Sequence, residues 1–237
     1  MTWPELIICC LIAYLIGAIP FSWLFVRVLD GIDLRTVGSG NLGSTNATRV
    51  LGTRWGLVIQ ALDIVKGWLP VAALLTVANA VAFIYDLGVG FVPIPNTLPI
   101  SAENAALVAG MAAVLGHMFP VYMRFRGGKG VNTTLGVFFA LAPKATLVAL
   151  VAGLAVMAAT RYVSLGSIIG SIVLLLAVCF FYHEQTALII VTAAIALLIV
   201  FMHRSNIRRL LAGTERRFGS KIVVEESREG QTGSKDR

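Results

Sequence analysis

The chain has 237 residues, of which 57% are hydrophobic and 13% are charged, and its mean hydropathy is +0.85. Soluble domains carry about 25% charged residues, so the composition excludes a soluble globular protein and indicates an integral membrane protein. The formal net charge of +7 is spread over short loops beside apolar runs. This distribution favours contact with membrane lipid and with anionic ligands, and it argues against a nucleic-acid partner.

Apolar runs of about 20 residues predict the membrane-spanning helices. The first run, 4–28, has no basic start and no cleavage site, so we expect a retained helix and not a signal peptide. The run 131–160 is too long for one span and is interrupted at Pro143, which predicts two shorter helices. The other predicted helices are 55–78, 104–123, 165–182 and 186–202.

The basic residues predict how these helices are oriented. The connections at 29–54, 124–130 and 161–164 and the segment after 202 are basic, whereas the opposite loops hold only Lys144. The positive-inside rule then places the N-terminus outside and the C-terminus in the cytoplasm. We therefore predict an all-α integral membrane protein, a seven-transmembrane-helix bundle.

The domain organisation follows from the same pattern. Residues 1–219 are predicted to form a single transmembrane catalytic domain, and the polar segment 220–237 is predicted to be a disordered cytoplasmic tail. The loop 79–103 contains three prolines. It is expected to be irregular and to lie along the outer surface.

A polar stretch at 37–46 directly follows the first apolar run and reads Val-Gly-Ser-Gly-Asn-Leu-Gly-Ser-Thr-Asn. Its glycines allow several backbone N–H groups to turn toward one anion, and its short polar side chains add donors. Arg35 and Arg49 stand on either side. We interpret the stretch as a phosphate site, and the alternative is a flexible linker. The candidate residues are Gly38, Ser39, Gly40, Asn41, Gly43, Thr45, Asn46 and Arg49.

A second glycine-rich stretch, Arg-Phe-Arg-Gly-Gly-Lys-Gly at 124–130, precedes the run 131–160. A lysine beside a helix N-terminus favours anions. The stretch is not a nucleotide P-loop, because glycine and not Ser or Thr follows the lysine. The alternative is a positively charged turn. The candidates are Gly127, Gly128, Lys129 and Gly130, and His117 just upstream is interpreted as a packed histidine.

A third polar stretch, His-Arg-Ser-Asn-Ile-Arg-Arg-Leu at 203–210, ends the last apolar run. On a helix, His203 and Asn206 are one turn apart and share a face, so they could hold one polar ligand together with an arginine. The alternative is a basic helix end whose side chains reach toward the membrane surface. Arg161 and Ser164, in the remaining basic turn, are added as candidates.

Some features and absences narrow the chemistry. Asp63 and Lys66 lie three residues apart in an apolar run and are interpreted as a structural ion pair. The sequence has no run of aspartates typical of a magnesium site. It also lacks the His-x4-Asp motif that is typical of one class of acyltransferases. We expect no metal and no other cofactor.

The three stretches resemble, in order and spacing, the three cytoplasmic motifs of the bacterial acyl-phosphate-dependent glycerol-3-phosphate acyltransferases. The resemblance covers roughly residues 4–219. Ser44 and Asn132 stand where alanine is common in that family, and the loop 79–103 and the tail 220–237 look like additions. The resemblance implies a multi-pass enzyme of the bacterial inner (cytoplasmic) membrane, with its active site on the cytoplasmic face.

The resemblance also implies a reaction. An acyl group passes from acyl phosphate to the 1-hydroxyl of sn-glycerol 3-phosphate and gives lysophosphatidic acid and phosphate, the first acylation step of phospholipid biosynthesis. A functional link to the enzyme that makes acyl phosphate is implied as well. The expected catalytic residues are Ser39, Arg49, Lys129, His203 and Asn206. The acyl chain is expected to lie between helices, open to lipid.

Two questions stay open at the level of sequence. The base is either His203 or a phosphate oxygen of a substrate. The alternative functions are a transporter of phosphorylated metabolites and a non-catalytic protein that binds anionic lipids. A transporter should place its charges near the membrane midplane, whereas these motifs cluster at one face.

Overall fold

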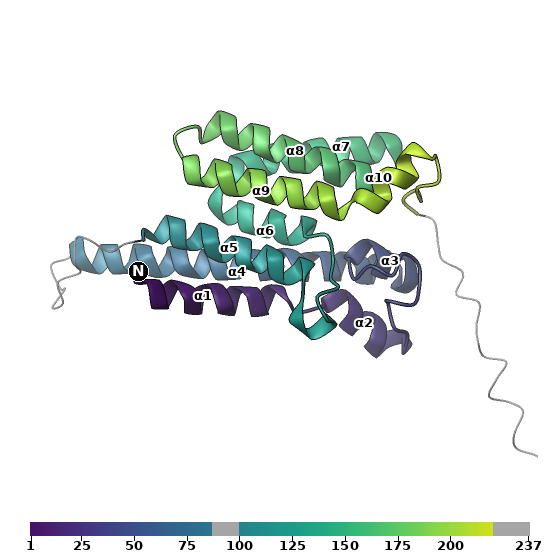
Figure 1. Cartoon of the computed structure of the whole chain (residues 1–237), viewed down its shortest axis with the longest axis horizontal. Coiled ribbons are helices and arrows are strands. Elements are labelled where there is room, and N and C mark those ends of the chain that lie inside the picture. Colours follow the sequence, from purple (N-terminus) through teal and green to yellow (C-terminus); the bar gives the residue numbers. More distant parts are fainter. Residues whose placement is uncertain (87–99, 220–237) are drawn as a thin grey trace, which may run out of the picture.

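The computed structural model describes residues 1–86 and 100–219, and every regular element in these ranges is helical (Figure 1). The elements are α1 (Trp3–Gly17), α2 (Phe21–Asp30), α3 (Ser44–Leu51), α4 (Thr53–Asp86), α5 (Ala102–Met118), η1 (Val121–Met123), α6 (Val131–Leu141), α7 (Pro143–Thr160), α8 (Val163–Phe181), α9 (Thr186–Met202) and α10 (Arg204–Leu211). Within the described ranges, five candidate spans are long and apolar enough to cross a membrane, or six when the bent pair α9–α10 is included. The predicted all-helical membrane fold is confirmed.

The first apolar run is broken, where we expected one helix over 4–28. α1 ends at Gly17 and α2 begins at Phe21, directly after Pro20. Proline has no N–H group, and its ring collides with the carbonyl one turn earlier, so it interrupts a helix. The carbonyl of Ile19 in the break accepts a hydrogen bond of 2.8 Å from Lys66 Nζ.

Lys66 also forms the predicted ion pair. Its Nζ lies 2.8 Å from Oδ1 of Asp63, and both side chains are buried in α4. Buried charges in a membrane protein need partners of this kind. The pair therefore ties the break between α1 and α2 to the middle of the bundle.

The predicted interruption at Pro143 is confirmed. α6 ends at Leu141, and Pro143 is the first residue of α7, a position where a missing N–H group costs no hydrogen bond. α6 has only 11 residues. It packs against α4 and α5 on one side and α7 on the other (Figure 1), so longer helices cover this short one.

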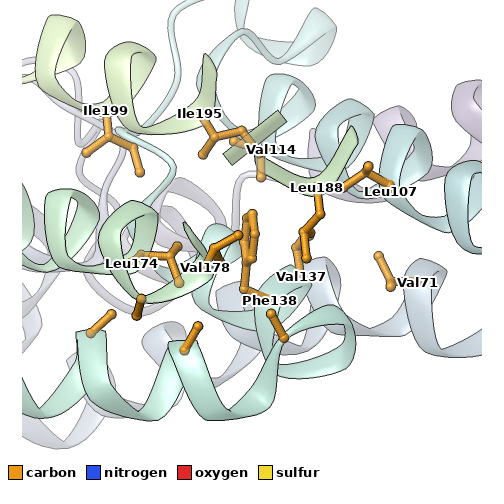
Figure 2. Packing of buried hydrophobic residues seen from close by; sticks show 14 of the residues in the cluster. Val71, Leu107, Val114, Val137, Phe138, Leu174, Val178, Leu188, Ile195 and Ile199 are labelled. Carbon is orange, nitrogen blue, oxygen red and sulfur yellow. The ribbon is translucent and has the colours of Figure 1, made fainter. Parts of the chain in front are cut away.

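The main apolar core surrounds Phe138 of α6, which is fully buried. Val114 of α5, Val178 of α8 and Ile195 of α9 belong to the same cluster (Figure 2). Many large apolar side chains on the outer faces of the helices are exposed, for example Phe180 at 76%. Such extensive apolar exposure fits contact with lipid.

The region expected to be an irregular outer loop is partly helical. α4 continues to Asp86, so residues 79–86 are helical, and α5 begins at Ala102. Residues 87–99 of that loop and the predicted tail at 220–237 lie outside the described residues.

The polar motifs collect at one end of the bundle. The short helices α2, α3 and α10 lie at the same end in Figure 1, and α10 is bent away from α9 by 55°. The stretches 37–46, 124–130 and 203–210 are all located there.

Candidate active site

The three motif stretches line one polar cavity of about 200 Å³ at this end of the bundle. The sequence candidates that line it are Gly38, Ser39, Asn41, Gly43, Thr45, Asn46, Arg49, Lys129, Gly130, Ser164, His203 and Asn206. Four candidates do not line it, namely Gly40, Gly127, Gly128 and Arg161.

Asn46 holds the glycine loop in shape. Its side-chain oxygen accepts a hydrogen bond of 3.1 Å from the N–H of Ser39, and its Nδ2 donates to the carbonyl of Val37 at 3.1 Å. Gly38 and Gly40 have φ of 65° and 66°, in the left-handed region that favours glycine. The buried amide of Asn46 is thus used by the loop itself and is not a free donor to a ligand.

Two side-chain contacts fix the loop against the second motif. Asn41 Nδ2 donates to the carbonyl of Gly127 at 3.2 Å, and its oxygen accepts from the N–H of Gly43 at 2.9 Å. Ser44 Oγ accepts from Asn132 Nδ2 at 3.0 Å. Ser44 and Asn132, the two residues that stand where alanine is common in the resembled family, therefore contact each other and join α3 to α6.

The glycine loop and α3 form one wall of the cavity, and other groups of this wall are free to bind a ligand. In the part of the chain that the structure describes, the hydroxyls of Ser39 and Thr45 and the guanidinium of Arg49 have no hydrogen-bond or ion-pair partner. Arg49 is half-buried, and burial lowers its pKa, yet a guanidinium stays charged. Arg35, by contrast, pairs with Asp33 at 2.6 Å and does not line the cavity. This wall is suited to an anion.

The opposite wall is a connected polar network. Lys129 Nζ donates to Asn206 Oδ1, and Asn206 Nδ2 donates to Glu215 Oε1 at 2.6 Å. Glu215 also accepts from Ser164 Oγ at 2.8 Å and from Arg209 Nε at 2.7 Å. These contacts hold Asn206, and through it Lys129, in one orientation.

Glu215 is not among the site residues expected from the sequence. The only signal for it is a single acidic residue that follows the basic end of the third motif. Burial favours the protonated acid, but hydrogen bonds from Asn206, Ser164 and Arg209 outweigh it and hold the pKa of the Glu215 carboxyl below its usual value. Glu215 is therefore a carboxylate near neutral pH.

Lys129 is a cation whose charge is sensitive to pH. Burial lowers the pKa of its ammonium to about 8, and Glu215 offsets only part of this effect. The positive charges of Arg209 and Arg49 act in the same direction as burial. The cavity therefore holds an excess of positive charge in the absence of an anion.

His203 lies at the bend between α9 and α10, and not within one helix with Asn206 as the spacing suggested. Its Nδ1 is 2.8 Å from the carbonyl of Ile199. A carbonyl only accepts hydrogen bonds, so Nδ1 carries the proton and Nε2 has the free lone pair. Burial and the charge of Lys129 lower the pKa of the imidazole to about 4. His203 is thus neutral at pH 7 and is a weak base.

Gly127 and Gly128 pack against α5. A Cβ on Gly128 would lie 2.0 Å from Nε2 of His117, and one on Gly127 would lie 2.2 Å from the His117 carbonyl. His117 is buried, as interpreted from the sequence, with its Nδ1 3.7 Å from Asp63. These two glycines therefore allow a close approach to α5, and this approach places Lys129 in the cavity.

An apolar groove of about 360 Å³ adjoins the polar cavity. Helices α4, α6, α7 and α8 contribute most of its lining. The groove and the cavity share the residues Thr45, Gln60, Val131, Asn132, Val163 and Ser167. The two spaces therefore meet along one boundary.

Glycines allow the helices around the groove to approach closely. A Cβ on Gly166 would lie 2.5 Å from the carbonyl of Gly153, and one on Gly56 would lie 2.0 Å from Oγ1 of Thr48. The groove follows α8 from Val163 to Leu174, a rise of roughly 16 Å. It is long enough to take a substantial part of an acyl chain.

Comparison with known proteins gives one consistent result. The family model described as glycerol-3-phosphate acyltransferase matches residues 7–213. The glycerol-3-phosphate acyltransferase of Thermoanaerobacter sp. (strain X514) is 40% identical over 218 residues, with 92% of this chain and 98% of the relative covered. The one from Myxococcus xanthus (strain DK1622) is 40% identical over 208 residues, with 88% and 97% covered.

The fold is similar to solved structures of PlsY (YgiH), described as an integral membrane glycerol 3-phosphate acyltransferase. Its glycerol 3-phosphate form has a TM-score of 0.75 and 37% identity, with 91% of this chain and 96% of that chain covered. Its lysophosphatidic acid form has a TM-score of 0.71 and 34% identity, with the same coverage. Because the family match spans most of the chain, including all three motifs, this protein belongs to the glycerol-3-phosphate acyltransferase family of integral membrane proteins.

Proposed function

We propose that this protein transfers an acyl group from acyl phosphate to the 1-hydroxyl of sn-glycerol 3-phosphate and releases lysophosphatidic acid and phosphate. The observation that carries the proposal is the shared boundary between a cationic cavity and an apolar groove. One substrate carries both a phosphate and an acyl chain, and the other carries a phosphate on a polar glycerol. The glycerol 3-phosphate and lysophosphatidic acid forms of the solved relative support this acceptor and product.

Each substrate has a wall that suits it. The acyl chain lies in the groove, and the phosphate of acyl phosphate lies against the glycine loop, close to the hydroxyls of Ser39 and Thr45. Glycerol 3-phosphate binds Arg49, Lys129 and His203. Asn41 and Asn46 shape the loop, and Asn206 positions Lys129 through their hydrogen bond.

The chemistry needs no covalent enzyme intermediate and no cofactor, because acyl phosphate is an activated mixed anhydride. The 1-hydroxyl oxygen attacks the acyl carbon, and the bond from that carbon to the phosphate oxygen breaks. The hydroxyl proton moves to a phosphate oxygen, because phosphate has a pKa near 6 and His203 is the weaker base with a pKa of about 4. The lone pair of His203 Nε2 accepts a hydrogen bond from the 2-hydroxyl and so orients the glycerol, which leaves the proton of the 1-hydroxyl for the phosphate oxygen. The cationic groups stabilise the developing charge.

His203→Ala is expected to raise KM for glycerol phosphate about tenfold or more while kcat falls less than about tenfold, since only a positioning contact is lost. The variant should keep the pH dependence of the parent at saturating glycerol phosphate. Steady-state kinetics across pH measure both quantities. His183→Ala, in the exposed turn between α8 and α9, is the control, and a drop in kcat of about 1,000-fold in the His203 variant would make the histidine the base.

The pH dependence of kcat/KM for glycerol 3-phosphate should follow the loss of the proton from the Lys129 ammonium. Below its pKa of about 8 the side chain is charged and binds phosphate, and above that pH it is neutral. We therefore expect kcat/KM for glycerol 3-phosphate to fall as pH rises through about 8. Lys129→Arg should shift or remove this decline, because a guanidinium stays protonated. A profile that is unchanged in the arginine variant would assign the decline to another group.

We infer that the chain has seven membrane-spanning helices, an outside N-terminus and a cytoplasmic C-terminus. The six candidate spans, with the short buried α6 as a seventh, support this count. The concentration of basic motif residues at one end supports a cytoplasmic active site in the bacterial inner membrane. Reporter fusions after Leu51 and after Tyr182 test this orientation, and the same compartment for both would contradict it.

A reconstituted assay tests the reaction itself. Purified protein in liposomes receives labelled glycerol 3-phosphate and either acyl phosphate or acyl-CoA. Labelled lysophosphatidate should form with acyl phosphate and not with acyl-CoA. Product with acyl-CoA alone would overturn the proposed donor, and no product with either donor would overturn the proposed reaction.

A further inference from the structure

The segment after α10 folds back across the boundary between the cavity and the groove. We call residues 214–218 the strap. Glu215 is buried in the polar network, Arg216 lines the cavity, and Phe218 lines the groove. One short segment therefore contacts both spaces in which the two substrates are proposed to lie.

Arg161 fixes the far end of the strap. The N–H of Phe218 donates to the Arg161 carbonyl at 2.6 Å, and Arg161 Nη2 donates to the Phe218 carbonyl at 3.2 Å. Arg161 itself has a φ of 62°, a strained value for a residue with a side chain, and such strain persists where the surroundings fix it. These contacts explain why the guanidinium of this candidate residue does not line the cavity.

Two further residues, Glu215 and Arg217, fix the rest of the strap. The carboxylate of Glu215 is held by Ser164 of α8 and Arg209 of α10, and the guanidinium of Arg217 lies 5.7 Å from the centre of the Tyr162 ring. The strap is thus attached to the turn between α7 and α8 as well as to α10. It is a defined wall of the site and not a loose chain end.

The position of this wall matters for the chemistry. In the proposed complex, the acyl carbon lies where the groove meets the cavity, and water competes there with the glycerol hydroxyl. Attack by water would form a bond from its oxygen to the acyl carbon, break the bond to phosphate and give a fatty acid and phosphate. Apolar surface at the mouth of the groove excludes water from the reacting carbon.

We propose that Phe218, held in place by Arg161, closes the mouth of the groove over the carboxyl end of the acyl chain and directs the acyl group to glycerol 3-phosphate and away from water. The inference rests on the proposed function. Phe218 is half-exposed, so one part of its surface faces the groove while the rest faces outward. It is a specificity-determining residue for the acceptor, and Arg161 is its positioning residue.

The test measures free fatty acid and lysophosphatidate together in the reconstituted assay. Phe218→Ala should raise the ratio of fatty acid to lysophosphatidate about fivefold or more and raise KM for acyl phosphate by a similar factor, because apolar contact and water exclusion are both lost. KM for glycerol 3-phosphate should change less than about twofold, because Phe218 does not line the polar cavity. Phe218→Leu keeps an apolar side chain and should restore most of the transfer.

Arg161→Ala should raise the product ratio and KM for acyl phosphate in the same direction but by less, since its backbone contact with Phe218 remains. Leu211→Ala is the matched control, because this side chain is 85% exposed just before the strap and lines neither space. Melting temperatures of all variants separate a folding defect from a change in the ratio of fatty acid to lysophosphatidate. If Phe218→Ala fails to fold, Arg161→Ala decides the question.

The outcomes separate the two proposals. If the parent protein makes no lysophosphatidate from acyl phosphate, the proposed function fails. If the parent is active while the folded Phe218→Ala and Arg161→Ala variants keep its product ratio and its KM for acyl phosphate, only the role of the strap is overturned. A rise in KM for glycerol 3-phosphate alone would also overturn that role.

Discussion

Lys129→Ala is expected to lower kcat/KM for glycerol 3-phosphate by about 1,000-fold, because the variant loses the buried cation that we propose binds the phosphate and stabilises its charge. Lys129 is held by Asn206, and the network continues to Glu215. Removal of the ammonium also leaves the Asn206 oxygen without its donor. Steady-state kinetics in reconstituted liposomes measure the effect.

Two companion variants make this prediction specific. Lys144→Ala removes an exposed lysine from the first turn of α7 and should keep kcat/KM within about twofold of the parent. Lys129→Arg keeps the charge with a different shape and should fall between the parent and the alanine variant. Near-normal activity of Lys129→Ala would show that the phosphate of glycerol 3-phosphate binds elsewhere.

Arg49→Ala should be the second most damaging change, with a loss of about 100-fold or more in kcat/KM. Within the described residues, no carboxylate neutralises Arg49 through an ion pair, although it is half-buried at the cavity. A cation in this state is available to a bound phosphate. The inhibition constant of inorganic phosphate, measured as a competitor of glycerol 3-phosphate, should rise in parallel with KM for glycerol 3-phosphate.

The nearby Arg35 supplies the control for Arg49. It is exposed and already paired with Asp33, so Arg35→Ala should change kcat/KM less than about threefold. Arg49→Lys keeps the charge and loses the two-pronged donor geometry, so an intermediate loss is expected. Equal losses in the Arg35 and Arg49 variants would point to a general effect of positive charge and not to a site at Arg49.

The sequence predicts the helices well because membrane spans are encoded locally. Hydropathy identifies most of the apolar runs that form helices. Pro143 marks the break between α6 and α7, because proline interrupts a helix. The break at Pro20 is missed because the residues around it are themselves apolar, so a hydropathy average passes over it. The helical residues at 79–86 are missed because the prolines farther along that loop suggest irregular structure.

The site is predicted less completely, because its geometry depends on contacts between distant segments. The types and spacing of the polar residues indicate the cavity residues Arg49, Lys129 and His203. The pairing of Ser44 with Asn132 joins positions 88 residues apart, and nothing local in the chain indicates it. The same holds for Glu215, whose role depends on Ser164 and Asn206.

The role of the two loop amides, Asn41 and Asn46, also depends on contacts that the sequence does not indicate. Asn41 and Asn46 have the donors that a phosphate loop needs, and the sequence therefore favours ligand contact. The folded chain uses those donors for its own backbone carbonyls, because buried backbone groups need partners as much as a ligand does. Composition alone cannot distinguish these two uses.

A structure of the protein with glycerol 3-phosphate and a non-hydrolysable acyl phosphonate bound together tests the proposed arrangement of the two substrates most directly. We expect the acyl chain in the groove between α4, α6, α7 and α8, with its phosphonate beside Ser39 and Thr45. We expect the glycerol phosphate at Arg49 and Lys129, with its 1-hydroxyl close to the acyl carbon. An acyl chain outside the groove, or a glycerol phosphate away from both cations, would contradict this arrangement.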